Sequence, residues 1–353
     1  MLIIKPNCKY LPEYEDAHVE HVVKCAGICY GNDPFKEREY PIDYIKVYQS
    51  LIAHDHLSPL RHSTFYYIIP FDEFELTDFD ELLCPMYYCK EDNNVYVTIN
   101  GQYWREHPKL NSFYAKYNVN KHFYVTQANK QSKDNRTQIL QTLRYTFILT
   151  TQISTSRELN RVSPNNICEQ STRYCKFSLP KFDEDVAICE PHWLNVCQRI
   201  QVVDGQVQRY SNYDAVKIYK STANGKYYIS VPYVQECELG EEWLISTKGI
   251  PQKNGSSICY HTGYAEEYLK RACDATSLYR EALKAGFKPE DARGILPLDT
   301  ATKVVYTYSY KEWQHILDLR LRGTTEDPHP NCIEVMSILE KILNEEHSSY
   351  CFF

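Results

Sequence analysis

The chain has 353 residues, of which 43% are hydrophobic and 24% charged, a composition typical of a globular protein with one large or two ordinary cores. Its formal net charge of −7 argues against a surface that coats nucleic acid. No stretch approaches the roughly 18 apolar residues that span a bilayer, and the opening Met-Leu-Ile-Ile-Lys is too short for a signal peptide. We therefore expect a cytoplasmic protein without a membrane partner.

The cysteine and tyrosine contents are both high. The 14 cysteines are scattered along the chain, which favours free thiols in a cytosolic protein. The spacings Cys84 to Cys89 and Cys168 to Cys175 are not those of zinc ribbons, so the sequence predicts no metal site. The 31 tyrosines indicate an AT-rich coding genome such as that of a virus or phage.

In chain order, the first predicted helix covers Asp16 to Ala26, and the apolar spacing within Pro41 to His54 predicts a second. The stretch from His56 to Ile69 reads as a loop that enters a β-strand. An acidic segment that we expect to be exposed to solvent comes next. In Val95 to Trp104, apolar and polar residues then alternate as in a strand that runs into a turn. Arg144 to Thr150 is the next predicted strand.

The second half of the chain alternates predicted strands and helices. A strand is expected within Val186 to Leu194, and the runs 215–219 and 227–231 flank Asn224-Gly225, a strong hairpin signal. Tyr264 to Ala285 is the clearest predicted helix and stops at Gly286. It is followed by a helix that opens at Lys288, a strand over Lys303 to Ser309 and an amphipathic helix over Tyr310 to Arg322.

The densest polar chemistry lies between Ser156 and Tyr174. This stretch follows an apolar run closely, so its charges lie near the mouth of a buried element. It contains two arginines, Arg161 and Arg173, together with neighbouring serine and threonine hydroxyls, and Pro-Asn-Asn turn chemistry that allows the two arginines to converge. Guanidinium groups beside hydroxyls form a good anion cradle, because they match phosphate oxygens.

Here a family resemblance emerges. The motif E-L-N-R ending at Arg161, followed after a gap by E-Q-S-T-R-Y from Glu169, resembles the signature segment of the flavin-dependent thymidylate synthases (ThyX). The hallmark of that family is Arg-His-Arg, and the corresponding positions here are Arg161, Val162 and Ser163. The resemblance implies that Arg161 touches both nucleotide and flavin, whereas the missing His and Arg would have faced the flavin ring.

A second block resembles the family motif H-x-S/T-P-x-E-H, with His56 and Ser58 at flavin-contacting positions. The glutamate of that motif is replaced by Arg61, a reversal of charge. Longer family members carry a strand that ends Asn-x-Arg, and Gln102 stands in place of that arginine.

Two C-terminal blocks complete the resemblance. The motifs A-R-x-x-L-P, which contains Arg293, and W-x-H-x-x-x-L-R, which ends at Arg320, resemble segments whose arginines bind the nucleotide. His329 resembles a histidine that contacts the flavin.

The resemblance implies an α/β (α+β) fold, a mixed sheet with flanking helices, in one domain over residues 1–353 with insertions at about 71–143 and 200–260. It implies a homotetramer that transfers a methyl group to C5 of dUMP, using FAD, methylenetetrahydrofolate and NADPH. The implied catalytic residues are Ser171 and Arg161. The implied substrate-binding residues are Glu158, Arg161, Glu169, Gln170, Ser171, Thr172, Arg173, Arg293 and Arg320. The implied cofactor-binding residues are His56, Ser58, Arg161, Lys311, His315 and His329.

The residues implied to bind the nucleotide (the nucleotide-side residues) are kept, whereas several of those implied to contact the flavin (the flavin-side residues) are altered. Three hypotheses follow. The chain is a divergent thymidylate synthase, or a related pyrimidine nucleotide enzyme with altered one-carbon chemistry such as a hydroxymethylase, or a non-catalytic nucleotide-binding homologue. Loss of the His and Arg beside the ring predicts weaker flavin binding in any of the three.

Overall fold

The computed structural model describes residues 1–14, 17–36, 40–162, 165–177, 185–197, 200–203, 206–209, 215–230, 237–239, 244–248, 250–251, 257–258 and 262–351. The chain divides into two compact units, each with its own hydrophobic core. Unit 1 comprises Met1–Asn7, Thr150–Glu158 and Ser171–Thr302. Unit 2 comprises Cys8–Leu149, Leu159–Gln170 and Lys303–Phe353.

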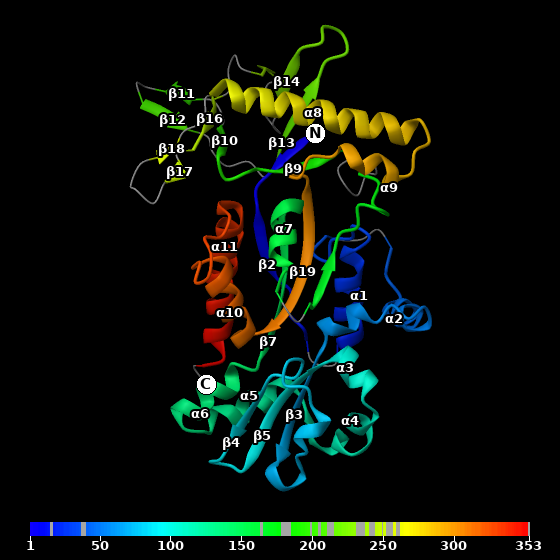
Figure 1. The fold of residues 1–353 in the computed structure, drawn as a ribbon, viewed down its shortest axis with the longest axis vertical. Coiled ribbons are helices and arrows are strands. Elements are labelled where there is room, and N and C mark those ends of the chain that lie inside the picture. Colours follow the sequence, from blue (N-terminus) through cyan, green and yellow to red (C-terminus); the bar gives the residue numbers. More distant parts are fainter. Residues whose placement is uncertain are drawn as a thin grey trace. The chain divides into compact units, whose positions relative to one another are not determined.

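Figure 1 shows the helices and strands along the chain. The α-helices are α1 (His18–Ile28), α2 (Tyr44–Ala53), α3 (Gly101–Glu106), α4 (Pro108–Ser112), α5 (Lys121–Asn129), α6 (Lys133–Leu140), α7 (Ile153–Leu159), α8 (Thr262–Lys284), α9 (Pro289–Ala292), α10 (Tyr310–Arg320) and α11 (Pro330–Ser349). Short 3-10 helices include η1 (Ser58–His62), η4 (Tyr114–Tyr117) and η6 (Arg293–Ile295).

The strands of unit 2 are β2 (Asn7–Tyr10), β3 (Thr64–Pro70), β4 (Met86–Cys89), β5 (Asn94–Asn100), β6 (Asn118–Val119), β7 (Arg144–Gln152), β8 (Ile167–Glu169) and β19 (Ala301–Ser309). The first residue of β2, the last three of β7 and the first two of β19 are assigned to unit 1. The strands of unit 1 are β1 (Leu2–Ile4), β9 (Ala187–Cys189), β10 (Leu194–Cys197), β11 (Ile200–Val203), β12 (Gln206–Arg209), β13 (Ala215–Lys220), β14 (Tyr227–Ser230), β15 (Cys237–Glu238), β16 (Leu244–Thr247), β17 (Ile250–Pro251) and β18 (Ser257–Ile258).

The central sheet of unit 2 has the strand order β2-β7-β19-β8, and its two faces follow from the alternation of side chains along a strand (Figure 1). On β7, Tyr145 and Phe147 point into a core that also contains Trp313 of α10 and residues of α11. Ile148 and Thr146 point to the opposite face, where Ile148 joins a small cluster with residues of α1. The sheet is therefore covered by α10 and α11 on one side and by α1 on the other.

A second sheet of unit 2 has the order β4-β5-β3-β6, with β3 paired antiparallel to β5 along its whole length. Buried Tyr67, Ile69 and Val97 form its inner layer, packed against α3 and η4 residues. Because η1 leads directly into β3, this sheet fixes the position of the residues between His56 and His62.

Unit 1 is built on a five-stranded sheet of order β15-β14-β13-β1-β9, covered by the long helix α8. The apolar positions Ala265, Leu269, Ala272 and Cys273 recur at helical spacing and are all buried in the core of this unit. Gly286 has a φ of +94°, the left-handed conformation that ends the helix, as the sequence predicted.

Several predicted elements are confirmed, and their limits shift by a few residues. The mixed α/β class is confirmed, as are the helices now named α1, α2, α8 and α10 and the strands β7, β9 and β19. The predicted hairpin forms between β13 and β14, but its loop is longer than a two-residue turn, since Lys220 pairs with Tyr227 and Ser221 N–H donates to the carbonyl of Lys226. Asn224 lies within that loop and accepts from the Lys226 N–H.

Other predictions were incomplete. The expected turn after β5 is the start of α3, because the Asn100 side chain accepts from the Tyr103 N–H and caps that helix. The segment 71–143 carries the helices α3 to α6, which the sequence reading did not predict, and α11 was also missed. The single-domain interpretation and its two insertions remain predictions.

Across the described ranges, no helix is both long and apolar enough to cross a membrane. The cysteines whose side chains the structure describes are free thiols.

Candidate functional site

A polar cluster in unit 1 contains four of the predicted substrate-binding residues. Ser171 lies in a turn, where its hydroxyl accepts from the Arg173 N–H at 3.2 Å. Arg293, at the junction of α9 and η6, donates from Nη1 to the Thr172 hydroxyl at 2.9 Å. The sequence predicted that these residues act together, and the fold of unit 1 brings them side by side.

This cluster is open to solvent. The Arg173 side chain is 55% exposed and forms an ion pair with Glu290 of α9, with 3.4 Å between Nε and Oε2. An exposed ion pair contributes at most about 1 kcal/mol to stability, so it holds the guanidinium loosely. Two arginines and two hydroxyls on one accessible surface can accept the oxygens of a phosphate, with the Glu290 partner exchanged for the ligand.

The other nucleotide-side residues occupy mixed environments. Glu169 Oε2 accepts from the Asn160 amide at 3.2 Å, and the Gln170 side chain accepts from the Lys303 N–H of β19 at 3.3 Å. Gln170 therefore fastens the segment after β8 to the edge of the central sheet. Arg161 is exposed in the turn after α7, and Glu158 is half-buried on that helix.

Two predicted flavin-side residues line one cavity of unit 2. Its volume is about 560 Å³, and His56 and Ser58 lie in its wall together with Arg61 and Gln102. Arg61 and Gln102 both depart from the family motifs, and they are in contact, because Arg61 Nε donates to Gln102 Oε1 at 2.6 Å. Arg61 Nη1 also donates to the carbonyl of Asn165 at 2.8 Å. The residues that replace the glutamate and the arginine of the family motifs are therefore hydrogen-bonded to each other.

The same wall contains the Cys29 thiol. A hydrogen bond with the Cys168 thiol lowers the pKa of Cys29. No sequence pattern predicts this contact, because Cys29 and Cys168 meet through the packing of α1 against β8.

A further cavity of unit 2, about 450 Å³ in volume, contains two more of the predicted flavin-side residues in its wall. Lys311 and His315 of α10 line it, together with Val162, which occupies the position of the motif's histidine. Its remaining wall is rich in aromatic and amide groups, including Tyr87, Tyr88, Gln138 and Tyr308. Sequence reasoning missed these residues, since β4, α6 and β19 come together only in the fold.

Arg320 and His329 lie apart from both of these cavity walls. Arg320 is the last residue of α10 and is half-buried. His329 is the N-cap of α11, where Nδ1 accepts from the Asn331 N–H at 3.2 Å. Its capping contact accounts for a histidine at this position without a ligand.

A family model described as "Thymidylate synthase complementing protein" matches residues 114–347, most of the chain. The protein belongs to this family, that of the flavin-dependent thymidylate synthases.

Curated relatives give shorter matches. The flavin-dependent thymidylate synthase of Pyrococcus abyssi is 37% identical over 83 residues, which are 24% of this chain and 32% of that protein. The probable flavin-dependent thymidylate synthase of Paramecium bursaria Chlorella virus 1 is 32% identical over 88 residues, 25% of this chain and 39% of that protein. These matches span between 32% and 39% of the relatives' own length.

Among solved structures, the UMP/dUMP methylase PolB from Streptomyces cacaoi bound with 5-Br dUMP is 16% identical. That comparison covers 66% of this chain and 82% of PolB, with a TM-score of 0.37.

Proposed function

We propose that this protein is a divergent flavin-dependent thymidylate synthase, which methylates C5 of dUMP. The observation that carries the proposal is the cluster of Ser171, Thr172, Arg173 and Arg293, a phosphate-compatible surface built from the family's own motif residues. Family membership supports the reaction class, and similarity to flavin-dependent thymidylate synthases supports the flavin dependence and the thymidylate product.

In this proposal the two arginines clamp the nucleotide phosphate, and the Ser171 hydroxyl polarises the base. Arg161, Glu158 and Glu169 act at neighbouring nucleotide-side positions, and Arg320 contributes a further cation. Clamping and orientation accelerate the reaction, since they replace a bimolecular encounter with a held geometry. Because the family needs no cysteine nucleophile, none of the cysteines has an assigned catalytic role.

The residues around the two larger cavities of unit 2 are compatible with a flavin. His56, Ser58 and Arg61 offer donors suited to a pyrophosphate, and the second cavity offers aromatic walls beside Lys311 and His315. A bound flavin supplies hydride chemistry close to the pyrimidine. The protein's part is to hold the ring and exclude water. Methylenetetrahydrofolate as carbon donor, NADPH as reductant and a homotetrameric assembly belong to the same proposal.

Flavin should bind more weakly than in relatives that keep Arg-His-Arg. Val162 offers no donor to the cavity that it lines, and Ser163 lies outside the described residues. Each missing charge-assisted hydrogen bond removes about 1–3 kcal/mol, so we expect FAD affinity lower by about two orders of magnitude. The double variant Val162→His with Ser163→Arg should tighten FAD binding, as measured by flavin fluorescence quenching. Wild type already saturated by FAD, with no gain in the variant, would contradict this part of the proposal.

The deciding experiment is tritium release from C5-labelled dUMP in the presence of FAD, methylenetetrahydrofolate and NADPH. Release with dTMP as product supports the proposal. Release with a hydroxymethylated nucleotide assigns the altered one-carbon enzyme instead, and mass spectrometry of the product distinguishes the two. dUMP binding without any release identifies a non-catalytic homologue.

A further inference from the structure

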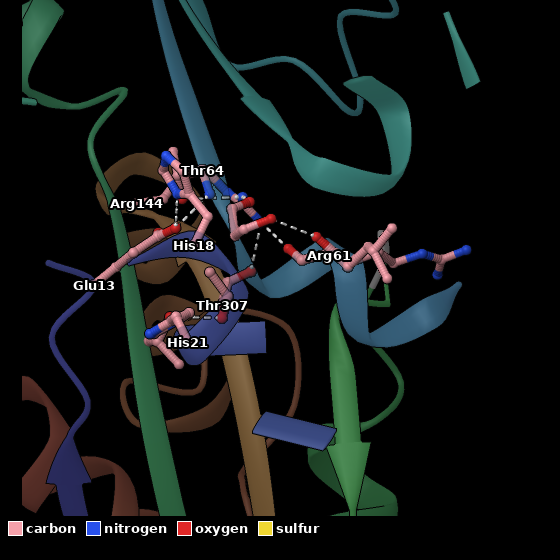
Figure 2. Close-up of polar contacts among 10 residues, drawn as sticks. Glu13, His18, His21, Arg61, Thr64, Arg144 and Thr307 are labelled. Atoms are coloured by element: carbon pink, nitrogen blue, oxygen red, sulfur yellow. Dashed lines mark hydrogen bonds and ion pairs between the residues drawn. The ribbon is translucent and has the colours of Figure 1, made fainter. Parts of the chain in front are cut away.

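Unit 2 contains another cavity, about 200 Å³ in volume, whose wall includes none of the residues predicted from the family motifs. It is formed by the segment after β2, by α1, β3 and β7, and by the start of α5. Charged and aromatic side chains line it together: Glu13, His18, Phe65, Lys121 and Arg144. Figure 2 shows the polar contacts among several of these residues.

Arg144 is a buried cation in this wall, with only 6% of its surface exposed. Its terminal nitrogens donate to neutral acceptors: the carbonyls of Ser63, Arg61 and Thr307 and the Thr64 hydroxyl. Within the described part of the chain, no carboxylate lies within 4.0 Å of the guanidinium, and Nε has no acceptor. Burial lowers the pKa of Arg144, whereas Glu312 and Glu13 raise it from beyond ion-pair distance, so carboxylates are nearby but none pairs with the guanidinium directly. Burial of a charge without a direct ion pair is costly, which points to an anion supplied from outside the chain.

Figure 2 also shows that the guanidinium of Arg61 points away from this cluster, so only its carbonyl takes part. Arg61 and Arg144 therefore line different cavities, although Arg144 donates a hydrogen bond to the Arg61 carbonyl. Arg144 remains the central cation of the smaller cavity.

Lys121 is a second cation without a carboxylate partner. Its Nζ donates to the Tyr350 hydroxyl at 2.8 Å and lies 4.4 Å from the centroid of the Tyr350 ring. It forms no ion pair with any carboxylate in the described ranges, and an ammonium has two further protons to donate. Two cations in one small cavity, neither directly neutralised, favour an anionic ligand.

Glu13 adds a specific acceptor. Its Oε1 accepts from the Thr64 N–H at 3.0 Å and pairs with His18 Nδ1 at 2.7 Å, whereas no described residue donates to Oε2. Burial alone would raise the pKa of Glu13, but the hydrogen bond with His18 and the nearby His21 outweigh it and lower the pKa, so the carboxylate stays charged. A ligand in this cavity therefore meets two cations and one carboxylate acceptor.

Aromatic rings form the part of the cavity wall beside Glu13. The rings of His18 and Phe65 lie 4.7 Å apart, and Phe65 stacks on Trp104 at 4.8 Å with an interplanar angle of 10°. Such a layer packs favourably against the face of a planar ligand.

We propose that this cavity binds a small aromatic carboxylate that also carries a hydrogen-bond donor. The ligand carboxylate accepts from Arg144 Nε and the Lys121 ammonium, its ring contacts the tilted rings of His18 and Phe65, and its donor meets Glu13 Oε2. A free phosphate dianion is disfavoured, since Glu13 repels it and the aromatic wall gives it nothing to contact. The inference is independent of the proposed synthase activity.

The test uses the full chain and 4-hydroxybenzoate as probe, with isothermal titration calorimetry as the measurement. We expect saturable one-to-one binding. Methyl 4-hydroxybenzoate, which lacks the anion, should bind at least ten-fold more weakly, and benzoate, which lacks the donor, several-fold more weakly. No saturable binding of 4-hydroxybenzoate at millimolar concentration would overturn the proposal. So would tighter binding of inorganic phosphate.

Two variants locate the site. Lys121→Met and Glu13→Gln should each weaken 4-hydroxybenzoate binding about ten-fold, whereas Lys116→Met should not, because Lys116 pairs with Glu73 and does not line the cavity. The thermal midpoint of each variant is measured beside its affinity. Among the described residues, the Lys121 side chain contacts Tyr350 and the ring of Tyr145 and no carboxylate, so its variant should fold even if the Glu13 variant does not. Unchanged affinity in folded Lys121→Met would place the ligand elsewhere and refute the inference.

Discussion

The arginines of the two units are held in opposite ways. In unit 1, Arg173 and Arg293 lie on an exposed surface with one weak contact each to Glu290 and Thr172. In unit 2, Arg144 is buried and donates to three carbonyls and a hydroxyl, and Arg61 is fixed by Gln102 and a carbonyl. The exposed pair can be lost without harm to the fold, whereas the buried one cannot.

This difference in burial indicates which arginines need a bound ligand to explain their presence. An exposed arginine that the fold does not need is available to a ligand, and the unit 1 cluster lies within the residues that the family model matches. A buried arginine such as Arg144 must satisfy the fold first, and its hydrogen bonds to backbone carbonyls do so.

The largest expected effect is that of Arg144→Met on stability. Removing the guanidinium leaves the carbonyls of Ser63, Arg61 and Thr307 without this donor, so the free energy of unfolding should fall by about 3–5 kcal/mol. Urea denaturation measures it. The control Arg105→Met, at an exposed position of α3, should change stability by less than about 0.5 kcal/mol. Equal losses in the two variants would erase the contrast between buried and exposed arginines.

Arg173→Ala should act on binding and not on stability. Loss of one charge-assisted phosphate contact costs about 1.5–3 kcal/mol, so calorimetry should show dUMP affinity reduced ten-fold or more. Arg271→Ala is a matched control, because Arg271 is also exposed in unit 1 and also pairs with a glutamate, Glu267. An unchanged dissociation constant in both Arg173→Ala and Arg320→Ala would remove the nucleotide interpretation.

The comparison of buried with exposed groups also predicts how stability depends on pH, through His347. Burial lowers the pKa of His347 to about 4, with a further contribution from the charge of Lys121, so the folded protein keeps it neutral. As the pH falls below about 6.5, the unfolded chain takes up the proton first, and stability is lost progressively toward pH 4. His347→Gln should recover about 1–2 kcal/mol of that acid loss between pH 7 and pH 4.5.

Thermal melts across this range measure the effect of His347→Gln. His54→Gln, at an exposed position, should leave the pH dependence as in the wild type. A pH profile that His347→Gln does not change would assign the acid sensitivity to other groups.

The smallest expected effect concerns the paired substitutions. Gln102→Arg alone places two guanidinium groups together and should cost about 0.5–1 kcal/mol, while Arg61→Glu with Gln102→Arg restores an attractive pair. A double-mutant cycle should therefore show favourable coupling of about 1 kcal/mol in stability. Strictly additive effects would mean that the contact between positions 61 and 102 carries no energy.

Much of this protein could be predicted from its sequence by itself. Helix α8 follows from its apolar spacing and from Gly286, and β7 and β19 follow from apolar runs, since these signals depend only on nearby residues. The unit 1 cluster was also predicted, because Ser171, Thr172 and Arg173 are consecutive and Arg293 stands in a recognisable motif. Helices α5 and α6 were missed although they are local, because polar or weakly periodic stretches resemble solvated loops. Helix α11 was missed although its buried apolar residues, among them Val335, Met336 and Leu339, recur at helical spacing.

Only the tertiary structure decided which distant residues meet. Contact between Arg61 and Gln102 depends on the register of β3 against β5, and the cavity around Arg144 depends on four separate segments closing on one another. No local pattern encodes such distances. The sequence specified which arginines the chain carries, and packing decided which of them are buried without a counter-ion, because burial is a property of the surrounding elements and not of the residue.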